Sequence, residues 1–225
     1  MIETTGSERS DARLGFWLAT VGFVAALGYA SRFAGDNRPD RTVLYEWTTA
    51  IGGAVQFGIF LAIAIAISGG SRARLGLRRP RSWRRALGLA AFAFFACWIG
   101  LGLLDRIVQG GQEQGLTPDR WDPSRAAQFA ANFVVIAVLA PVVEELLFRG
   151  IGFHLLARFG TTAAILGTGL AFGLYHGLLN ALPILALFGV ALGWLRARTN
   201  SVYPGILVHA AFNSVALIVS VTING

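Results

Sequence analysis

The sequence predicts an all-α protein, a polytopic transmembrane helical bundle of about seven spans. Hydrophobic residues make up 55% of its 225 residues and charged residues only 14%, whereas soluble domains are about 25% charged. Apolar segments of membrane-crossing length recur between short polar connections. The basic residues, all of them arginines, gather in a few of those connections. This clustering is typical of membrane topology and argues against a nucleic-acid partner.

The expected spans follow the apolar segments in order. They cover residues 14–30, 47–68, 86–104, 126–159, 161–179, 182–195 and 203–223. Every span should be helical, because backbone polar groups in lipid must pair within their own segment. The fifth and sixth spans are short, so the connection at 180–183 is expected to lie within the bilayer region.

The arginines also predict the orientation of the chain. Residues 69–85 hold seven of them: Arg72, Arg74, Arg78, Arg79, Arg81, Arg84 and Arg85. Because cytoplasmic loops carry an excess of basic residues, this loop and the N-terminus are predicted to be cytoplasmic. The polar residues 105–125 and the C-terminus then lie outside, and we expect an integral protein of the plasma (inner) membrane. A compatible second role for the loop is to dock anionic lipid or substrate.

The fourth span carries two adjacent carboxylates and an arginine, Glu144, Glu145 and Arg149, just after Pro141, where a kink is expected. A charge at bilayer depth costs roughly 2.5–3.5 kcal/mol, so a functional role is the default interpretation. A structural ion pair is the alternative. Glu145 and Arg149 lie four residues apart and can pair on one helix face. Glu144 is rotated by about 100° from Glu145, so the two carboxylates need not share a role.

Helix lengths predict that polar groups of three spans meet at one depth. Glu144 lies sixteen residues before the turn at Gly160, and His176 lies sixteen residues after it. An antiparallel hairpin therefore places both at about the same level. His209 follows the turn before the last span by nine residues, or roughly 13 Å of helix. We expect this level to open toward the cytoplasmic side.

Two further pairs share a helix face at a spacing of four residues, namely His209 with Asn213 and Phe172 with His176. Phe172 can therefore pack beneath the imidazole of His176. A single histidine inside a membrane is often only a packing residue. Two histidines, an asparagine and a glutamate pair at one depth favour a functional site.

This set of side chains is suited to hydrolysis by an activated water. A buried carboxylate can act as general base, while imidazole and amide groups can stabilise an oxyanion. Alternatively, Glu144, His176 and His209 form a Zn²⁺ ligand set with an open water position. The sequence lacks the zincin motif His-Glu-x-x-His and the serine motif Gly-x-Ser-x-Gly. Cys97 is assigned to packing, and His154 is assigned no role.

Three motifs carry a family resemblance: Glu144-Glu145-x-x-x-Arg149, Phe172-x-x-x-His176 and His209-x-x-x-Asn213. In this order and spacing they resemble the CPBP family of CAAX proteases and bacteriocin-processing proteins, also called the ABI family. The resemblance covers residues 125–219. It includes type II CAAX prenyl endopeptidases, which remove the last three residues after a prenylated cysteine.

The resemblance implies a role for each motif residue. Glu144 would activate the water, and His176, His209 and Asn213 would complete the catalytic site. Glu145, Arg149 and Phe172 would support it. The family is usually classed with metalloproteases, which implies Zn²⁺ at Glu144, His176 and His209 as an open question.

We therefore expect N-terminal transmembrane helices and a basic loop over residues 1–120 and a catalytic core over residues 121–225, in the last four spans. The expected activity is an intramembrane endopeptidase that acts on a membrane-associated peptide or protein. One alternative is a non-catalytic scaffold or bacteriocin-immunity-type binding protein. Another is a proton-coupled carrier, because Glu and His chains also relay protons.

Overall fold

The computed structural model describes residues 2–35, 41–113, 116, 118 and 120–223. These residues form helices and connections, and none of them lies in a β-strand. In chain order the elements are α1 Ile2–Ala34, η1 Val43–Tyr45, α2 Trp47–Ser68, α3 Trp83–Val108, α4 Gly110–Glu113, η2 Pro123–Arg125, α5 Ala126–Val134, η3 Val135–Leu139, α6 Ala140–Glu144, η4 Glu145–Gly152, α7 Phe153–Leu156, η5 Ala157–Phe159, α8 Thr161–Tyr175, α9 Leu182–Thr199 and α10 Tyr203–Ile223.

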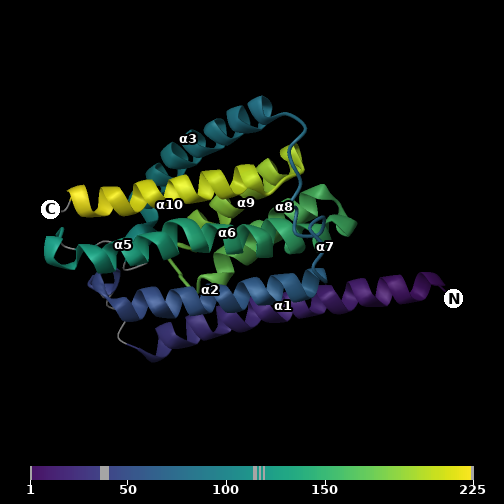
Figure 1. Cartoon of the computed structure of the whole chain (residues 1–225), viewed down its shortest axis with the longest axis horizontal. Helices are drawn as coiled ribbons and strands as arrows, with labels where there is room; N and C mark the ends of the chain where they lie inside the picture. Colours follow the sequence, from purple (N-terminus) through teal and green to yellow (C-terminus); the bar gives the residue numbers. More distant parts are fainter. Residues whose placement is uncertain (1, 36–40, 114–115, 117, 119, 224–225) are drawn as a thin grey trace.

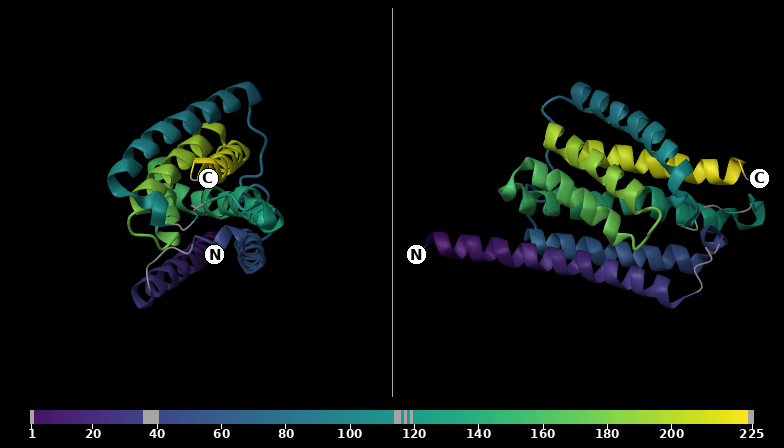
Figure 2. Two further views of the ribbon diagram at one scale, coloured as in Figure 1. Left: turned by 90° about the vertical axis from the view of Figure 1, so that its left-hand side faces the viewer. Right: turned by 180° about the vertical axis from the view of Figure 1, so that it is seen from behind.

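The long helices run roughly parallel to one axis and form one bundle (Figures 1 and 2). In Figure 1, α1 and α2 lie along the bottom, α3 and α10 at the top, and α5 and α6 between them. The two chain ends lie at opposite ends of the bundle. In the described part of the chain, six helical segments are long and apolar enough to cross a membrane, and α8 is a shorter apolar helix. The predicted all-α polytopic bundle of about seven helices is confirmed.

The helix ends follow local sequence signals. The Ser82 side chain accepts a hydrogen bond from the backbone N–H of Arg85 and caps α3, which therefore begins earlier than the expected third span. Gly69 after α2 and Asn200 after α9 adopt left-handed conformations, which end those helices. The expected spans 14–30, 86–104 and 182–195 are shorter than α1, α3 and α9, because these helices extend beyond the apolar segment.

The fourth span is continuous from η2 to η5 but includes two π-helical segments, η3 and η4. Pro141 lies two residues after the end of η3, in α6, and has no N–H for a carbonyl of the preceding turn. The second segment, η4, begins at Glu145 and contains Arg149. Wider π-turns inside α-helices are frequent at functional sites, and here they surround both carboxylates.

Helix α8 does not cross the bilayer. Its 15 residues span about 22 Å, which is less than the roughly 30 Å of hydrocarbon. The expected fifth span, 161–179, is therefore too long, because α8 ends at Tyr175 and residues 176–181 form a loop inside the bundle. Helix α8 packs closely on α9, where a Cβ on Gly189 would lie 2.8 Å from the Cα of Gly169.

The N-terminal helices pack directly against the last four spans. The indole N–H of Trp17, in α1, donates to the Leu147 carbonyl at 3.0 Å. Further along α1, Gly28 meets Gly177, and a Cβ on Gly28 would lie 2.9 Å from the Gly177 Cα. The division into residues 1–120 and 121–225 stays a prediction.

Candidate active site

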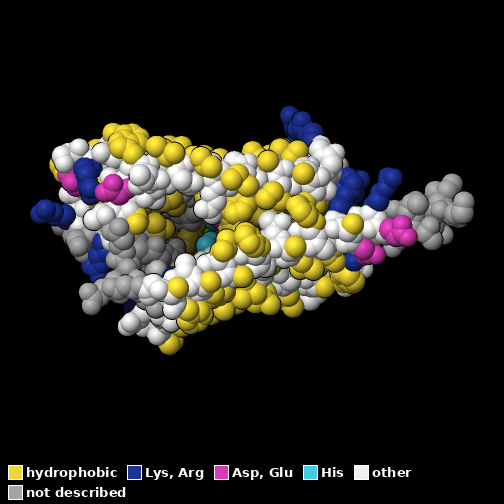
Figure 3. Space-filling model, turned by 90° about the horizontal axis from the view of Figure 1, so that it is seen from below, with side chains coloured by type: hydrophobic (Ala, Val, Ile, Leu, Met, Phe, Trp, Pro, Cys, Tyr) yellow, Lys and Arg dark blue, Asp and Glu magenta, His cyan; other side chains and the backbone are white. Residues whose placement is uncertain are grey.

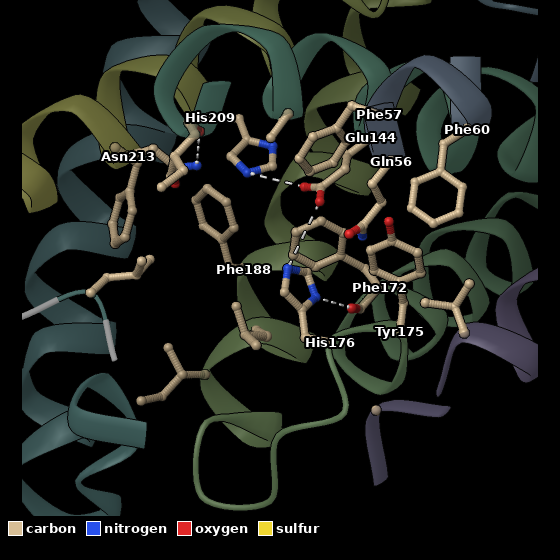
Figure 4. A pocket seen from close by; sticks show the side chains of 18 of the residues that line it. Gln56, Phe57, Phe60, Glu144, Phe172, Tyr175, His176, Phe188, His209 and Asn213 are labelled. Carbon is tan, nitrogen blue, oxygen red and sulfur yellow. Dashed lines mark hydrogen bonds and ion pairs between the residues drawn. The ribbon is translucent and has the colours of Figure 1, made fainter. Parts of the chain in front are cut away.

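Three side chains from three helical segments converge in the middle of the bundle (Figure 4). Glu144 ends α6, His176 follows α8, and His209 lies in the second turn of α10. The Nε2 of His209 lies 3.6 Å from Oε2 of Glu144, and the Nε2 of His176 lies 4.0 Å from Oε1. The prediction that these groups share one depth is confirmed by this contact.

The three side chains line one cavity, where a water lying beside them could contact the carboxylate and both imidazoles. Both separations are longer than a direct hydrogen bond, and a polar pair beyond about 3.5 Å is often bridged by water. Glu144 and His209 are almost fully buried, while 23% of the His176 side chain is exposed. A small molecule can therefore reach the carboxylate from the side of His176.

Glu145 points away from Glu144 and into a buried network. Its Oε1 lies 3.0 Å from Nη1 of Arg149 and 3.4 Å from Nδ1 of His209. Arg149 also donates from Nη2 to the carbonyl of Gly189 at 2.9 Å. Glu145 and Arg149 are fully buried, so each needs the other as a counter-charge. The predicted i,i+4 ion pair between Glu145 and Arg149 is present. Through Glu145 it contacts His209, and neither residue of the pair lines the cavity.

Aromatic rings pack against the imidazoles of His176 and His209. The Phe172 ring lies 4.7 Å from the His176 ring and 5.6 Å from the His209 ring, centroid to centroid. Its carbonyl oxygen lies 2.7 Å from Nδ1 of His176, which leaves Nε2 to face Glu144. Phe188 packs on the other side of His209 at 5.3 Å. The expected packing of Phe172 under His176 is confirmed.

Asn213 lines the same cavity one turn beyond His209. Its Nδ2 donates to the carbonyl of Ile136 at 2.9 Å. Ile136 precedes Pro141 by five residues, the spacing of a π-turn, and Pro141 has no N–H to offer it. Pro141 thus leaves the Ile136 carbonyl free to accept the hydrogen bond from Asn213. The second N–H of the amide and its oxygen are still available for a ligand.

The site lies in a cavity of about 1610 Å³ with a mainly apolar wall. Seen from the side of α1 and α2, the surface is hollowed, and a histidine is visible in the hollow (Figure 3). The wall includes residues between 16 and 31 of α1, 52 and 63 of α2, 98 and 105 of α3, and 209 and 220 of α10. The cavity is far larger than one water needs and can hold a peptide segment.

The cavity wall extends toward the connection before the fourth span, and the expected opening toward the cytoplasmic side stays a prediction. Gly111 and Leu116, from the connection before the fourth span, line it, and no residue of 69–85 does. The arginine loop instead folds inward over the site. A Cβ on Gly150 would lie 2.6 Å from the Leu75 carbonyl oxygen, and the Val202 N–H donates to the Gly76 carbonyl.

Sequence reasoning missed two polar residues of the cavity wall, Gln56 and Tyr175. Both lie beside Glu144 in the close view (Figure 4). Gln56 was detectable, because it is the one polar side chain among residues 50–67 of the sequence. Tyr175 packs its ring 5.4 Å from that of His176. Helix α2 thus contributes to a site whose motifs all lie in the second half of the chain.

The arrangement does not fit a metal ion as it stands. Among the residues that the structure describes, no group of three His, Cys, Asp or Glu side chains could hold one. The Glu144–His176 separation of 4.0 Å exceeds the edge of about 3.3 Å that a tetrahedral zinc site with ligands near 2.0 Å requires. Zinc binding stays a prediction.

The two residues set aside from the sequence lie away from the cavity. Cys97 is buried in α3 beside a shallow groove against α8 and α9. His154 belongs to α7, beyond Arg149 along the chain, and does not line the cavity. Neither residue lines the cavity that contains Glu144, and their assignment stays a prediction.

The comparisons with known proteins bear on the same region. Residues 126–215 match the model of the family described as type II CAAX prenyl endopeptidase Rce1-like. No curated protein and no solved structure gives a significant match to the chain. The matched region contains all seven motif residues, from Glu144 to Asn213. The match supports a protease function of the CAAX type in an integral membrane protein, and residues 126–215 are similar to the Rce1-like family, as the three motifs predicted.

Proposed function

We propose that the protein is an intramembrane endopeptidase that hydrolyses a peptide bond with a water activated by Glu144. The observation that carries the proposal is the pair of gaps between Glu144 and the two imidazoles, 3.6 and 4.0 Å. A water in the cavity beside these atoms would contact the buried carboxylate and the imidazole nitrogens together. The family match over residues 126–215 supports the same kind of chemistry.

In the proposed reaction Glu144 takes a proton from the water while the water oxygen attacks the scissile carbonyl carbon. The carbonyl oxygen becomes an oxyanion, which the second N–H of the Asn213 amide would stabilise. The Nε2 atom of His176 would accept a hydrogen bond from the attacking water, because the Nδ1 atom donates to the Phe172 carbonyl. The tetrahedral intermediate then collapses as the C–N bond breaks. The proton held by Glu144 passes to the leaving amine, and the carboxylate is restored.

The supporting residues act through position. Glu145 contacts Nδ1 of His209, and Arg149 neutralises the buried Glu145. Phe172 contacts both imidazole rings. These residues keep the Nε2 atom of His209 directed at Glu144. Catalysis depends on such positioning, because a shift of about 1 Å in a reacting group can slow the reaction strongly.

The proposed substrate is a membrane-associated peptide or protein, because the cavity is mainly apolar and lies within the membrane-spanning helices. A lipid-modified peptide such as a prenylated one is the form that the family suggests. Zinc binding at Glu144, His176 and His209 stays a separate prediction, because Glu144 and His176 lie too far apart for one tetrahedral site in this structure, and no step of the proposed reaction depends on it. Metal analysis of the purified protein tests that part separately.

The test uses purified protein and a membrane-anchored fluorogenic peptide. We expect Glu144→Gln to lower the rate of cleavage by about 10²–10⁴-fold, the usual contribution of a general base. Glu8→Gln, which removes an exposed carboxylate at the start of α1, is the matched control and should cleave at the wild-type rate. Undiminished cleavage by Glu144→Gln would refute the proposal, whereas peptide binding without cleavage by the wild type would favour a scaffold.

A further inference from the structure

A single polar side chain interrupts the apolar helix α2 near its middle. Gln56 is the tenth of the 22 residues of this helix, and the residues on either side of it, 50–55 and 57–67, are all apolar or glycine. An amide at this depth of a membrane is costly unless it has a polar partner. Gln56 is exposed and lines the cavity that contains Glu144. Its amide is therefore available to a partner inside that cavity.

The packing of α2 places Gln56 beside Glu144. Gly53 lies against the fourth span, where a Cβ on this glycine would lie 2.9 Å from Cγ1 of Val135. Gln56 follows Gly53 by three residues and therefore lies on a neighbouring part of the same helix face. In the close view, Glu144 lies between Gln56 on one side and Asn213 on the other (Figure 4). A group bound next to Glu144 can thus meet an amide on either side.

Tyr175 holds a hydroxyl group beside Gln56. Its ring packs against the rings of Phe60 at 5.5 Å and Phe148 at 5.3 Å between centroids, and only 5% of the residue is exposed. The hydroxyl lies next to the Gln56 side chain (Figure 4). Among the described residues it has no hydrogen-bond partner of good geometry, although a buried hydroxyl normally has one. A small rotation of the Gln56 side chain would complete this bond and fix the direction of the amide.

The same face of α2 has space for a peptide. Gly52 precedes Gln56 by one helical turn and also lines the cavity. A Cβ on Gly52 would meet no atom within 4 Å, so the cavity reaches the helix backbone at this position. An extended peptide in the cavity can therefore lie alongside Gly52 and approach the amide of Gln56.

From these observations we propose that Gln56 binds the backbone of the substrate next to the scissile bond and that Tyr175 positions Gln56. The N–H and C=O groups of one residue in an extended segment point to the same side, and a glutamine amide offers both an acceptor and donors. Gln56 accepts from that N–H and donates to that C=O, while its oxygen keeps a second lone pair for the Tyr175 hydroxyl. The inference rests on the proposed function for the statement that the cavity binds a peptide. Because the bonds involve only the backbone, they align peptides that differ in side chains.

Peptide binding tests the proposal without any cleavage. The protein carries Glu144→Gln and is titrated in detergent with a prenylated fluorescent peptide. In a set of analogues of this peptide, each N–H group near the scissile bond is replaced in turn by an ester oxygen, which removes one donor. Dissociation constants are measured for Glu144→Gln alone and combined with Gln56→Leu. Gln128→Leu, the same change on α5 outside the cavity wall, is the matched control.

We expect one ester analogue to bind Glu144→Gln about 3–10-fold more weakly than the parent peptide, as the loss of one hydrogen bond does. Addition of Gln56→Leu should abolish this difference, and addition of Gln128→Leu should preserve it. Tyr175→Phe should reduce it, because the amide is then no longer fixed. If Gln56 were only structural, its substitution would weaken all analogues equally. A difference between ester and parent peptide that persists in Gln56→Leu, or that is absent from the protein with Gln56, would overturn the proposal.

Two glycine substitutions test where the peptide lies. Gly52→Leu fills the space beside Gln56 and should weaken binding of the parent peptide. Gly58→Leu, on the same helix but outside the cavity wall and with nothing within 4 Å of its Cβ position, should bind as before. Equal binding by the two variants would contradict a peptide lying along α2.

The two proposals can fail separately. Cleavage that Glu144→Gln abolishes but Gln56→Leu leaves at the wild-type rate would overturn the role of Gln56 alone. Binding that depends on Gln56 and on one substrate N–H, in a protein whose wild type never cleaves the peptide, would refute only the proposed function.

Discussion

Glu144 and Glu145 are neighbours in the chain, yet they occupy different environments. Glu144 faces the cavity and the Nε2 atoms of two histidines. Glu145 lies outside the cavity, in contact with Arg149 and Nδ1 of His209. The about 100° step between successive helical residues separates them, so one carboxylate can act on water while the other holds a histidine in place.

This difference predicts that the same substitution, Glu to Gln, affects the stability of the protein strongly at Glu145 and little at Glu144. Glu145→Gln leaves the fully buried Arg149 without its counter-charge, and breaking such a pair typically costs about 3–5 kcal/mol. Glu144→Gln removes no arginine ion pair and should unfold close to the wild type. Thermal unfolding in detergent, followed by circular dichroism, measures both. A larger loss of stability in Glu144→Gln would contradict the assigned roles.

Residue spacing predicted the contacts within each helix. The pairs Glu145–Arg149 and Phe172–His176 follow from helical geometry alone, and both are present. Gln56 was not predicted, because no neighbouring motif marks α2 as part of the site. Its contribution depends on how α2 packs against α6 and η4, and the spacing of residues within one helix does not predict how that helix packs against others.

At the scale of elements, α1 holds the loop that presents His176. Gly28 in α1 and Gly177 in the loop pack backbone to backbone, and Gly177 has a left-handed φ of 62°. Such a close approach is possible only without side chains. The position of His176 therefore depends on a helix outside the family-matched region.

Substitution in α1 should accordingly disturb the site from a distance. Gly28→Leu places a side chain where even a Cβ would lie 2.9 Å from the Gly177 backbone, so the loop must move and cleavage should fall at least about tenfold, as sub-ångström misplacement does. Gly22→Leu, on the same helix with nothing within 4 Å of its Cβ position, is the control. Equal cleavage rates for the two variants would show that α1 does not position His176.

At the scale of the whole molecule, the number of helices and the shared depth of the polar groups were predictable, but the inward packing of the arginine loop was not. Apolar segment lengths locate helices, and counting from the turns placed Glu144 near His176. From the sequence, residues 69–85 were expected only to form a cytoplasmic loop rich in arginine. In the structure Leu75 and Gly76 fold back against Gly150 and Val202.

The account depends on side chains from separate helices acting as one unit on one water. Residues that act together lose their effects together, so their substitutions are strongly non-additive. The most direct measurement is the single-turnover cleavage rate of Glu144→Gln, His209→Ala and the double variant against the wild type. We predict that each single variant loses about 10²–10⁴-fold and that the double variant loses no more than the worse single one. Losses that multiply in the double variant, or a single variant that cleaves at the wild-type rate, would contradict the shared-water site.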